Sequence, residues 1–398
     1  MTADAAPAPH RYQALDALRG ICALCVCLFH FRAAGPLPRS DFVHGSWLFV
    51  DFFFVLSGFV IAANYRDRLI SGGFMRRFIV LRFGRVYPLH LVMLLAFIVM
   101  EVIGLMLHSK GLMQRAPFAG PTAPSAIITN IALLQVFGLH PGLTWNGPSW
   151  SIAAEFWTYI LFALAARQAG QALEKWLVAA ALASVAVLLV ATPHGINVSH
   201  DWSLFRCVYG FVVGAIAWRW WSRRGLGPQP MGNGATLVEL TSVAAVIGFV
   251  SFAGDTRLNL FAPLVFGGVL LVFAREGGGI SRVLRMAVPQ WLGLLSYSIY
   301  MVHTFVQSRL DGGLRLIGKA LHVSLTTHVS GRDGLPIELA GATAAQGTAL
   351  TLVMLALVVI TAAATQWLVE RPGQQLAKRR ADRFAASPID ASTADERR

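Results

Sequence analysis

Long apolar stretches constrain this sequence more than any other feature, because the hydrocarbon core of a bilayer takes about twenty apolar residues in helical form. Of the 398 residues, 56% are hydrophobic and only 13% are charged. A water-soluble domain has no need of so many long uncharged runs. The sequence therefore predicts an all-α integral membrane protein that crosses the bilayer many times.

About eleven apolar segments follow one another along the chain. The fourth, Ala126–Leu139, would reach only about 21 Å as a helix, and it is flanked by Pro124 and Pro141. This length falls short of the hydrocarbon core. We therefore expect a short re-entrant or interfacial segment there and about ten transmembrane helices elsewhere.

The distribution of basic residues indicates the orientation. The chain has 33 Lys and Arg against 20 Asp and Glu, a formal charge of +13. A basic balance can signal a nucleic-acid partner, but in a membrane protein basic residues gather in cytoplasmic loops. With ten crossings, the basic loops and both termini fall on the cytoplasmic side. We expect no nucleic-acid partner.

One membrane domain, residues 12–372, accounts for most of the chain. Residues 1–11 are expected to form a flexible tail, and residues 373–398 a polar cytoplasmic tail that is disordered and begins near anionic lipid. The longest outer connection, Asp311–Gln346, either covers a substrate entrance or is a plain surface loop. The four cysteines lie in apolar segments at no zinc-binding spacing, so no metal site is expected.

Two polar residues interrupt the first apolar segment. Arg19 and His30 lie eleven positions apart, so on a helix they face the same way with about 16 Å between them along the axis. Ionisable side chains in a bilayer usually face a protein interior or a wet cavity. We expect Arg19 near a cytoplasmic entrance, paired with Asp16 one turn away, and His30 deep inside.

Two further arginines, Arg82 and Arg85, follow the second segment and lie one turn apart if this stretch is helical. Because a guanidinium offers a planar fork of donors to phosphate oxygens, the pair predicts a phosphate site. The plainer alternative is that both are membrane-interface anchors, as we expect for Arg76 and Arg77.

Polar residues in three later segments are candidates for a substrate site. Ser151 and Glu155 are one turn apart, and Glu155 is either a general base, a group that orients His30, or an arginine's structural partner. Arg206 is either a substrate ligand or an interface anchor, and His303 either a ligand or a packing residue. Asp51 is expected to cap its helix or pair locally.

These residues belong to six short motifs: the Arg19 to His30 spacing, VDFFFVLSGFVI at Val50–Ile61, RFGR at Arg82–Arg85, PSWSIAAEFW at Pro148–Trp157, LLSYSIYMVH at Leu294–His303 and VERP at Val369–Pro372. As an ordered set the motifs resemble the acyltransferase 3 family of integral membrane acyltransferases. The resemblance implies an enzyme of the bacterial cytoplasmic (inner) membrane. Its donor would be acyl-CoA, commonly acetyl-CoA, and its acceptor a hydroxyl of a surface polysaccharide, glycolipid or other sugar.

The resemblance also implies roles for individual residues. Arg19 and His30 correspond to the family's essential pair, Arg82 and Arg85 to its R-x-x-R motif, and Ser151 and Glu155 to its W-S-x-x-x-E region. We expect the three arginines to bind CoA phosphates at the cytoplasmic end of a hydrophilic shaft. His30 would act at the inner end as a general base or an acyl carrier, oriented by Glu155, with Ser151, Arg206 and His303 toward the acceptor.

Two alternatives stay open from the sequence. One is a proton-coupled transporter or flippase of an acylated or acidic substrate, with His30, Glu155 and His303 as a proton relay. No inverted halves with matching broken helices support it. The other is an acyltransferase that acts on an intracellular small molecule. The acyl chain, the acceptor and the oligomeric state are left undecided.

Overall fold

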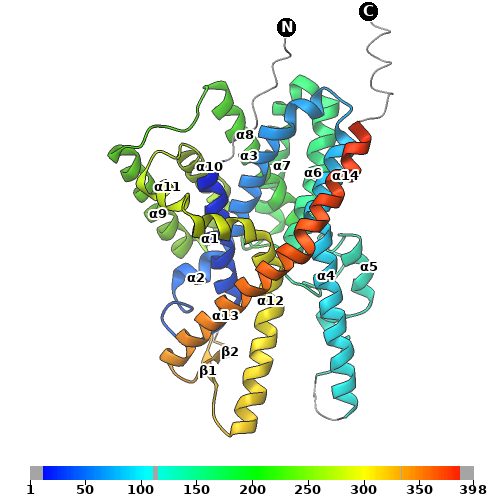
Figure 1. The fold of residues 1–398 in the computed structure, drawn as a ribbon, viewed down its shortest axis with the longest axis vertical. Helices are drawn as coiled ribbons and strands as arrows, with labels where there is room; N and C mark the ends of the chain where they lie inside the picture. Colours follow the sequence, from blue (N-terminus) through cyan, green and yellow to red (C-terminus); the bar gives the residue numbers. More distant parts are fainter. Residues whose placement is uncertain (1–11, 111–114, 333, 386–398) are drawn as a thin grey trace, which may run out of the picture.

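The computed structural model describes residues 12–110, 115–332 and 334–385. These residues form an almost entirely helical bundle with one small β-hairpin (Figure 1). The helices are α1 (Gln13–His30), α2 (Asp41–Gly45), α3 (Phe49–Ile70), α4 (Met75–Ser109), α5 (Ser125–Ile131), α6 (Ser149–Ala169), α7 (Leu173–Ala191), α8 (Ser203–Arg223), α9 (Asn233–Ala253), α10 (Ala262–Phe273), α11 (Gly279–Leu284), α12 (Ala287–Leu321), α13 (Ala344–Thr365) and α14 (Arg371–Ala385). The antiparallel hairpin joins β1 (Thr326–Ser330) to β2 (Pro336–Ala340).

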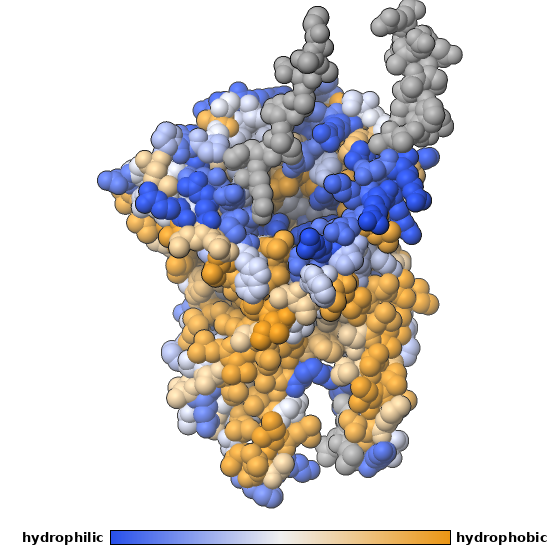
Figure 2. Space-filling model, viewed as in Figure 1, coloured by the Kyte–Doolittle hydropathy of each residue, from blue (hydrophilic) through white to orange (hydrophobic). Residues whose placement is uncertain are grey.

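Several of these helices have the length and composition of membrane spans. Six stretches of the described residues qualify: Gln13–His30, Asp41–Ile70, Met75–Ser109, Ser149–Ala191, Asn233–Ala253 and Ala344–Phe384. Figure 2 shows the apolar surface as a broad band, with a strongly hydrophilic end at the top. The chain is therefore an all-α membrane protein. The expected ten crossings and the cytoplasmic termini stay predictions.

Helix α1 packs along α12 at the centre of the bundle (Figure 1). The two axes approach closely because glycines meet there: a Cβ added to Gly20 would collide with the backbone at Leu292, and one on Gly293 with the backbone of Asp16. Small residues allow this kind of backbone approach between helices in a bilayer. The contact determines where the polar residues of both helices lie.

A buried ion pair joins α3 to α8. Arg206 donates to both carboxylate oxygens of Asp51 at 3.0 and 2.7 Å, and a third donor reaches the carbonyl of Val198 at 3.1 Å. The side chains are only 2% and 0% exposed. Trp47 and Trp150 contact the guanidinium, with 4.9 and 5.2 Å to the ring centroids. Asp51 thus pairs with a distant residue rather than locally, because α3 and α8 pack side by side.

Three sequence predictions meet a clear outcome in the fold. The segment Ala126–Leu139 contains only the seven-residue helix α5, which is too short to cross a bilayer, as expected. The predicted loop Asp311–Gln346 is partly wrong, since α12 continues to Leu321 and the hairpin follows it. The disorder predicted for residues 373–398 is wrong as far as Ala385.

The correction at the C-terminus has a packing reason. Helix α14 lies along α4, where Gly84 and Gly373 allow close contact with Ala377 and Pro88 respectively. Ala377 and Ala381 are buried, whereas the basic residues of α14 stay exposed. One apolar stripe is enough to dock a polar helix against the bundle. The predicted tail at residues 1–11 lies outside the described residues, as do residues 386–398.

We predict that Asp51→Asn strongly destabilises the protein, because it leaves the Arg206 guanidinium buried without a counter-charge. Breaking a buried pair from one side typically costs about 3–5 kcal/mol. Thermal denaturation in detergent measures the effect, with Asp67→Asn as a matched control on the exposed end of the same helix, where the side chain is 88% exposed. An Asp51→Asn variant as stable as wild type would contradict the structural role.

Candidate active site

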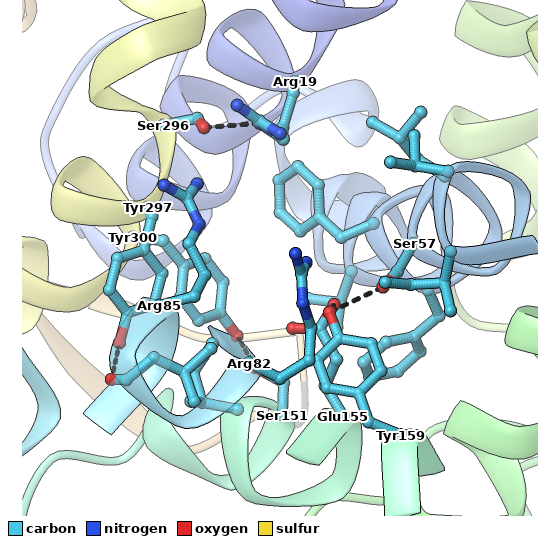
Figure 3. Close-up of a pocket in the computed structure, with 18 residues that line it drawn as sticks. Arg19, Ser57, Arg82, Arg85, Ser151, Glu155, Tyr159, Ser296, Tyr297 and Tyr300 are labelled. Carbon is cyan, nitrogen blue, oxygen red and sulfur yellow. Dashed lines mark hydrogen bonds between the residues drawn. The ribbon is translucent and has the colours of Figure 1, made fainter. Parts of the chain in front are cut away.

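Five helices enclose a cavity, the inner cavity, which provides about 140 Å³ of space for water-sized groups (Figure 3). Helices α1, α3, α4, α6 and α12 contribute its wall. Its polar lining consists of Arg19, Ser57, Arg82, Arg85, Ser151, Glu155, Tyr159, Ser296, Tyr297 and Tyr300. Five residues singled out from the sequence therefore line one space, although they come from three separate segments of the chain.

Arg19 is held in this cavity by α12. Its Nε donates to Ser296 Oγ at 2.7 Å and its Nη2 to the carbonyl of Gly293 at 3.1 Å. The expected ion pair with Asp16 on the same helix is confirmed at 3.9 Å. These contacts orient the guanidinium toward the cavity, where Figure 3 shows it near Arg85.

Arg82 and Arg85 reach the cavity from α4. Arg82 donates from Nη2 to the Tyr65 hydroxyl at 2.9 Å and lies over the Tyr65 ring, 5.0 Å from its centroid. Its Nε is buried without a hydrogen-bond partner among the described residues. A buried donor without a partner is costly, so this nitrogen is available to an acceptor such as water or a ligand.

The side chain of Arg85 is held by Glu370. This glutamate belongs to the VERP motif, but the sequence assigned it no role. Arg85 Nη1 donates to Glu370 at 2.5 Å, and Ser298 and Gln374 donate to the same carboxylate at 2.8 and 2.9 Å. Glu370 is 2% exposed and closes a π-helical turn, Gln366–Glu370. The sequence does contain a signal for this ion pair. Glu370 lies at the end of a long apolar run, where a carboxylate needs a cation as its partner.

Glu155 lies beside these arginines but does not contact His30. Its Oε1 accepts a 2.6 Å hydrogen bond from Tyr159, whose hydroxyl is 2.8 Å from Ser57 Oγ. Ser151 Oγ lies 2.8 Å from the Tyr300 hydroxyl on α12. The structure thus places Glu155 and Ser151 with the arginines. The expected orientation of His30 by Glu155 has no contact in the structure to support it.

A second and larger space, the outer cavity, lies at the other end of α1 and provides about 860 Å³. Its lining is Phe29, His30, Phe31, Arg32, Ala33, Pro38, Arg39, Val43, His44, Asp255, Val329, Ser330, Gly331, Arg332, Ile337 and Leu339. His30 is the last residue of α1 and is exposed to this cavity. The ring is thus accessible from this cavity, and its expected depth stays a prediction.

His30 and His303 form a pair between α1 and α12. The Nδ1 atom of His30 is 2.9 Å from the carbonyl of Val26 and 3.2 Å from Nε2 of His303. A carbonyl only accepts, so in the neutral ring this contact assigns the proton to Nδ1 of His30. The lone pair is then on Nε2, where a base or a nucleophile needs it.

The linings of the two cavities share no residue. Fully buried His303 contacts His30 at 3.2 Å, and its ring centroid is 5.8 Å from that of Tyr300, which lines the inner cavity. The residues expected to line one continuous shaft therefore line two cavities, Arg19, Arg82, Arg85 and Glu155 in one and His30 in the other. Arg206 lies in neither lining, and each of its three guanidinium nitrogens already donates, two to Asp51 and one to the carbonyl of Val198.

The described residues contain no group of three or more His, Cys, Asp or Glu side chains arranged to hold a metal ion. Three guanidiniums with a carboxylate form one half of the site, and an imidazole pair with an accessible nitrogen forms the other. Together they suit binding of an anion on one side and general-base or nucleophilic chemistry on the other.

Comparisons with known proteins identify the family to which the chain belongs. The model of the acyltransferase 3 family, described as an acyltransferase domain, matches residues 12–365. The chain is 27% identical to "Acyltransferase MdmB" of Streptomyces mycarofaciens over 367 residues, which cover 83% of this chain and 81% of that protein. It is 34% identical to "Protein 2 in picA locus" of Rhizobium radiobacter over 195 residues, 46% of this chain and 95% of that protein. No solved structure matches. The chain thus belongs to the acyltransferase 3 family and is an enzyme that transfers acyl groups.

Proposed function

We propose that the protein is a membrane O-acyltransferase that takes an acetyl group from acetyl-CoA on the cytoplasmic side. The acceptor is a hydroxyl of a surface polysaccharide, a glycolipid or another sugar on the outer side. The observation that carries this proposal is the convergence of Arg19, Arg82 and Arg85 on one cavity. Among the residues that the structure describes, none of these guanidiniums has all five of its donors engaged, so each has donors left for phosphate oxygens.

The inner cavity suits the donor side. Arg82 and Arg85 lie seven and ten residues after the start of α4 at Met75, which is a depth of about 10–15 Å. The first turn of α4 carries Arg76 and Arg77, and basic residues at the ends of membrane helices indicate the cytoplasmic side. The end of α14 lies at the same end of the molecule (Figure 1). A cytoplasmic donor thus meets these arginines before it reaches the centre of the bundle.

Glu155 is the carboxylate in the described lining of this cavity, and it repels a phosphate group. Figure 3 shows Glu155 next to Arg82, while Arg19 and Arg85 lie together on the side of α12. Like charges repel strongly in a medium of low dielectric constant. We therefore assign the phosphates to the space between the three guanidiniums, away from Glu155, and the uncharged pantetheine arm to the side of Glu155 and Ser151.

Transfer requires the acyl group to pass the layer formed by Tyr300 and His303. The Tyr300 side chain is held by contacts of its hydroxyl with Ser151 at 2.8 Å and the carbonyl of Pro148 at 3.2 Å. In the proposal the pantetheine arm displaces this ring and carries the thioester to the histidine pair. Side-chain rotation of this kind closes the path when no donor is bound.

His30 then activates the acceptor in the outer cavity. Its Nε2 removes the proton from the acceptor hydroxyl, the oxygen attacks the thioester carbonyl, and the CoA thiolate leaves and is protonated. His303 shares the Nδ1 proton of His30 and stabilises the imidazolium that forms. The acyl group crosses the membrane in this way without export of CoA.

We predict that His30→Ala lowers the rate of acyl transfer by at least about a hundredfold, the usual contribution of a general base. The measurement is release of free CoA by purified protein with acetyl-CoA and a sugar acceptor. His44→Ala is the matched control, because His44 lines the same cavity but pairs with Asp255 at 2.8 Å rather than with His303. Wild-type turnover in His30→Ala would exclude the assigned role.

The same assay distinguishes the general-base route from a covalent acyl-histidine. Transfer through a complex of donor, acceptor and enzyme gives intersecting double-reciprocal plots, which we expect. A covalent intermediate gives parallel plots, the pattern of ping-pong kinetics. Parallel plots would assign His30 the role of acyl carrier.

We predict that Arg82→Lys raises the KM for acetyl-CoA about tenfold while kcat changes little. Lysine keeps the charge but loses the fork that binds phosphate through two donors. Arg76→Lys is the matched control, since Arg76 lies on the same helix, is exposed and does not line the cavity. An unchanged KM in Arg82→Lys would favour the membrane-anchor alternative.

A further inference from the structure

We propose that the outer cavity selects acceptors that carry a negative charge, and that Arg32 and Arg39 bind this charge beside His30. The inference rests on the proposed function and adds the chemical class of the acceptor. The anionic group is a carboxylate or a phosphate of a sugar, bound while a neighbouring hydroxyl faces the imidazole.

The wall that carries Arg32 is fixed to the hairpin by backbone hydrogen bonds. The amide of Ala34 donates to the carbonyl of Ala340, and the amide of Ala340 donates to the carbonyl of Arg32, both at 2.9 Å. The segment after α1 therefore acts as a third strand beside β2. Arg32 is held about 7 Å or less from His30 along the chain, within the span of one or two sugar units.

On the opposite wall of the outer cavity, the acidic side chains are paired with residues other than Arg32 and Arg39. Arg332 in the hairpin turn pairs with Asp41 on α2 and lies 3.5 Å from Asp255, which also binds His44 at 2.8 Å. Asp255 is the only carboxylate in the cavity lining described, and it is shared by two cationic or hydrogen-bonding partners. The two described acids of this wall, Asp41 and Asp255, are therefore engaged with partners other than Arg32 and Arg39.

Two of the three arginines in this lining have no acidic partner among the described residues. Arg32 and Arg39 are exposed to the cavity, and neither side chain has a hydrogen bond or an ion pair with any residue that the structure describes. The described lining holds three arginines against one carboxylate. A concave site with such an excess of positive charge attracts anions and disfavours cations.

The arrangement distinguishes this site from the donor site. In the proposed function the CoA phosphates bind the arginines of the inner cavity. Arg32 and Arg39 belong to the outer cavity, and the two linings have no residue in common. The space is also large, about 860 Å³, against about 140 Å³ in the inner cavity. It therefore suits part of a glycan chain, with its charge on the arginines and one hydroxyl at Nε2 of His30.

The test measures binding of matched sugars to the full-length protein in detergent. The probes are a tetrasaccharide of alternating glucuronic acid and N-acetylglucosamine, the same tetrasaccharide with its carboxylates methyl-esterified, N-acetylglucosamine 6-phosphate and glucosamine. We expect the free acid to bind at least about tenfold more tightly than its ester. The double variant Arg32→Ala/Arg39→Ala should lose this preference, whereas Lys319→Ala, which removes an exposed outer cation outside the lining, should keep it.

Transfer kinetics separate this inference from the proposed function. In the double variant we expect the KM of an acidic acceptor to rise at least about tenfold, with the KM of acetyl-CoA unchanged. Tight binding of N-acetylglucosamine 6-phosphate but not of the uronic acid would assign the site to phosphate. Equal binding of acid and ester, or preference for glucosamine, would overturn the inference even if acetyl transfer occurs. Charge-selective binding without any transfer would instead contradict the proposed function.

Discussion

The contact between α1 and α12 is the interaction on which the rest of this structure depends. Glycines at Gly20 and Gly293 bring the two backbones together, and polar side chains on the facing surfaces then meet in register. Arg19 bonds to Ser296 near one end, and His30 meets His303 near the other. One helix pair thus carries both the anion-binding group and the imidazole of the proposed mechanism, and it separates them along the membrane normal.

That separation has a physical consequence for catalysis across a bilayer. A permanently open hydrophilic shaft would let water and small solutes through the membrane and would favour hydrolysis of the thioester. Here the rings of Tyr300 and His303 lie 5.8 Å apart and are buried, and in the proposed mechanism the two substrates approach this layer from opposite sides. In the account proposed, binding energy from the CoA phosphates is available to open that layer only when the donor is bound.

The sequence predicted contacts and directions within a single helix, but it did not predict the side-chain pairs that join two helices. Helical periodicity correctly placed Arg19 and His30 on one face of α1, and it paired Arg19 with Asp16. It did not give the depth of His30, because rise per residue measures distance along an axis and not where the helix ends in the protein. The grouping of Arg82, Arg85, Ser151 and Glu155 with Arg19 came from motif resemblance, and their roles stay predictions. The pairing of His30 with His303, and of Arg85 with Glu370, joins residues far apart in the chain and needed the fold.

The most direct test of the central claim uses sealed vesicles that contain the purified protein, since acetyl-CoA and a charged sugar do not cross a bilayer unaided. Acetyl-CoA is trapped inside and the acceptor is added outside, or both are added on the same side. The account predicts acetylated acceptor outside and free CoA retained inside in the first arrangement, and no product in the second. Product formed only when both substrates are on the same side would contradict it.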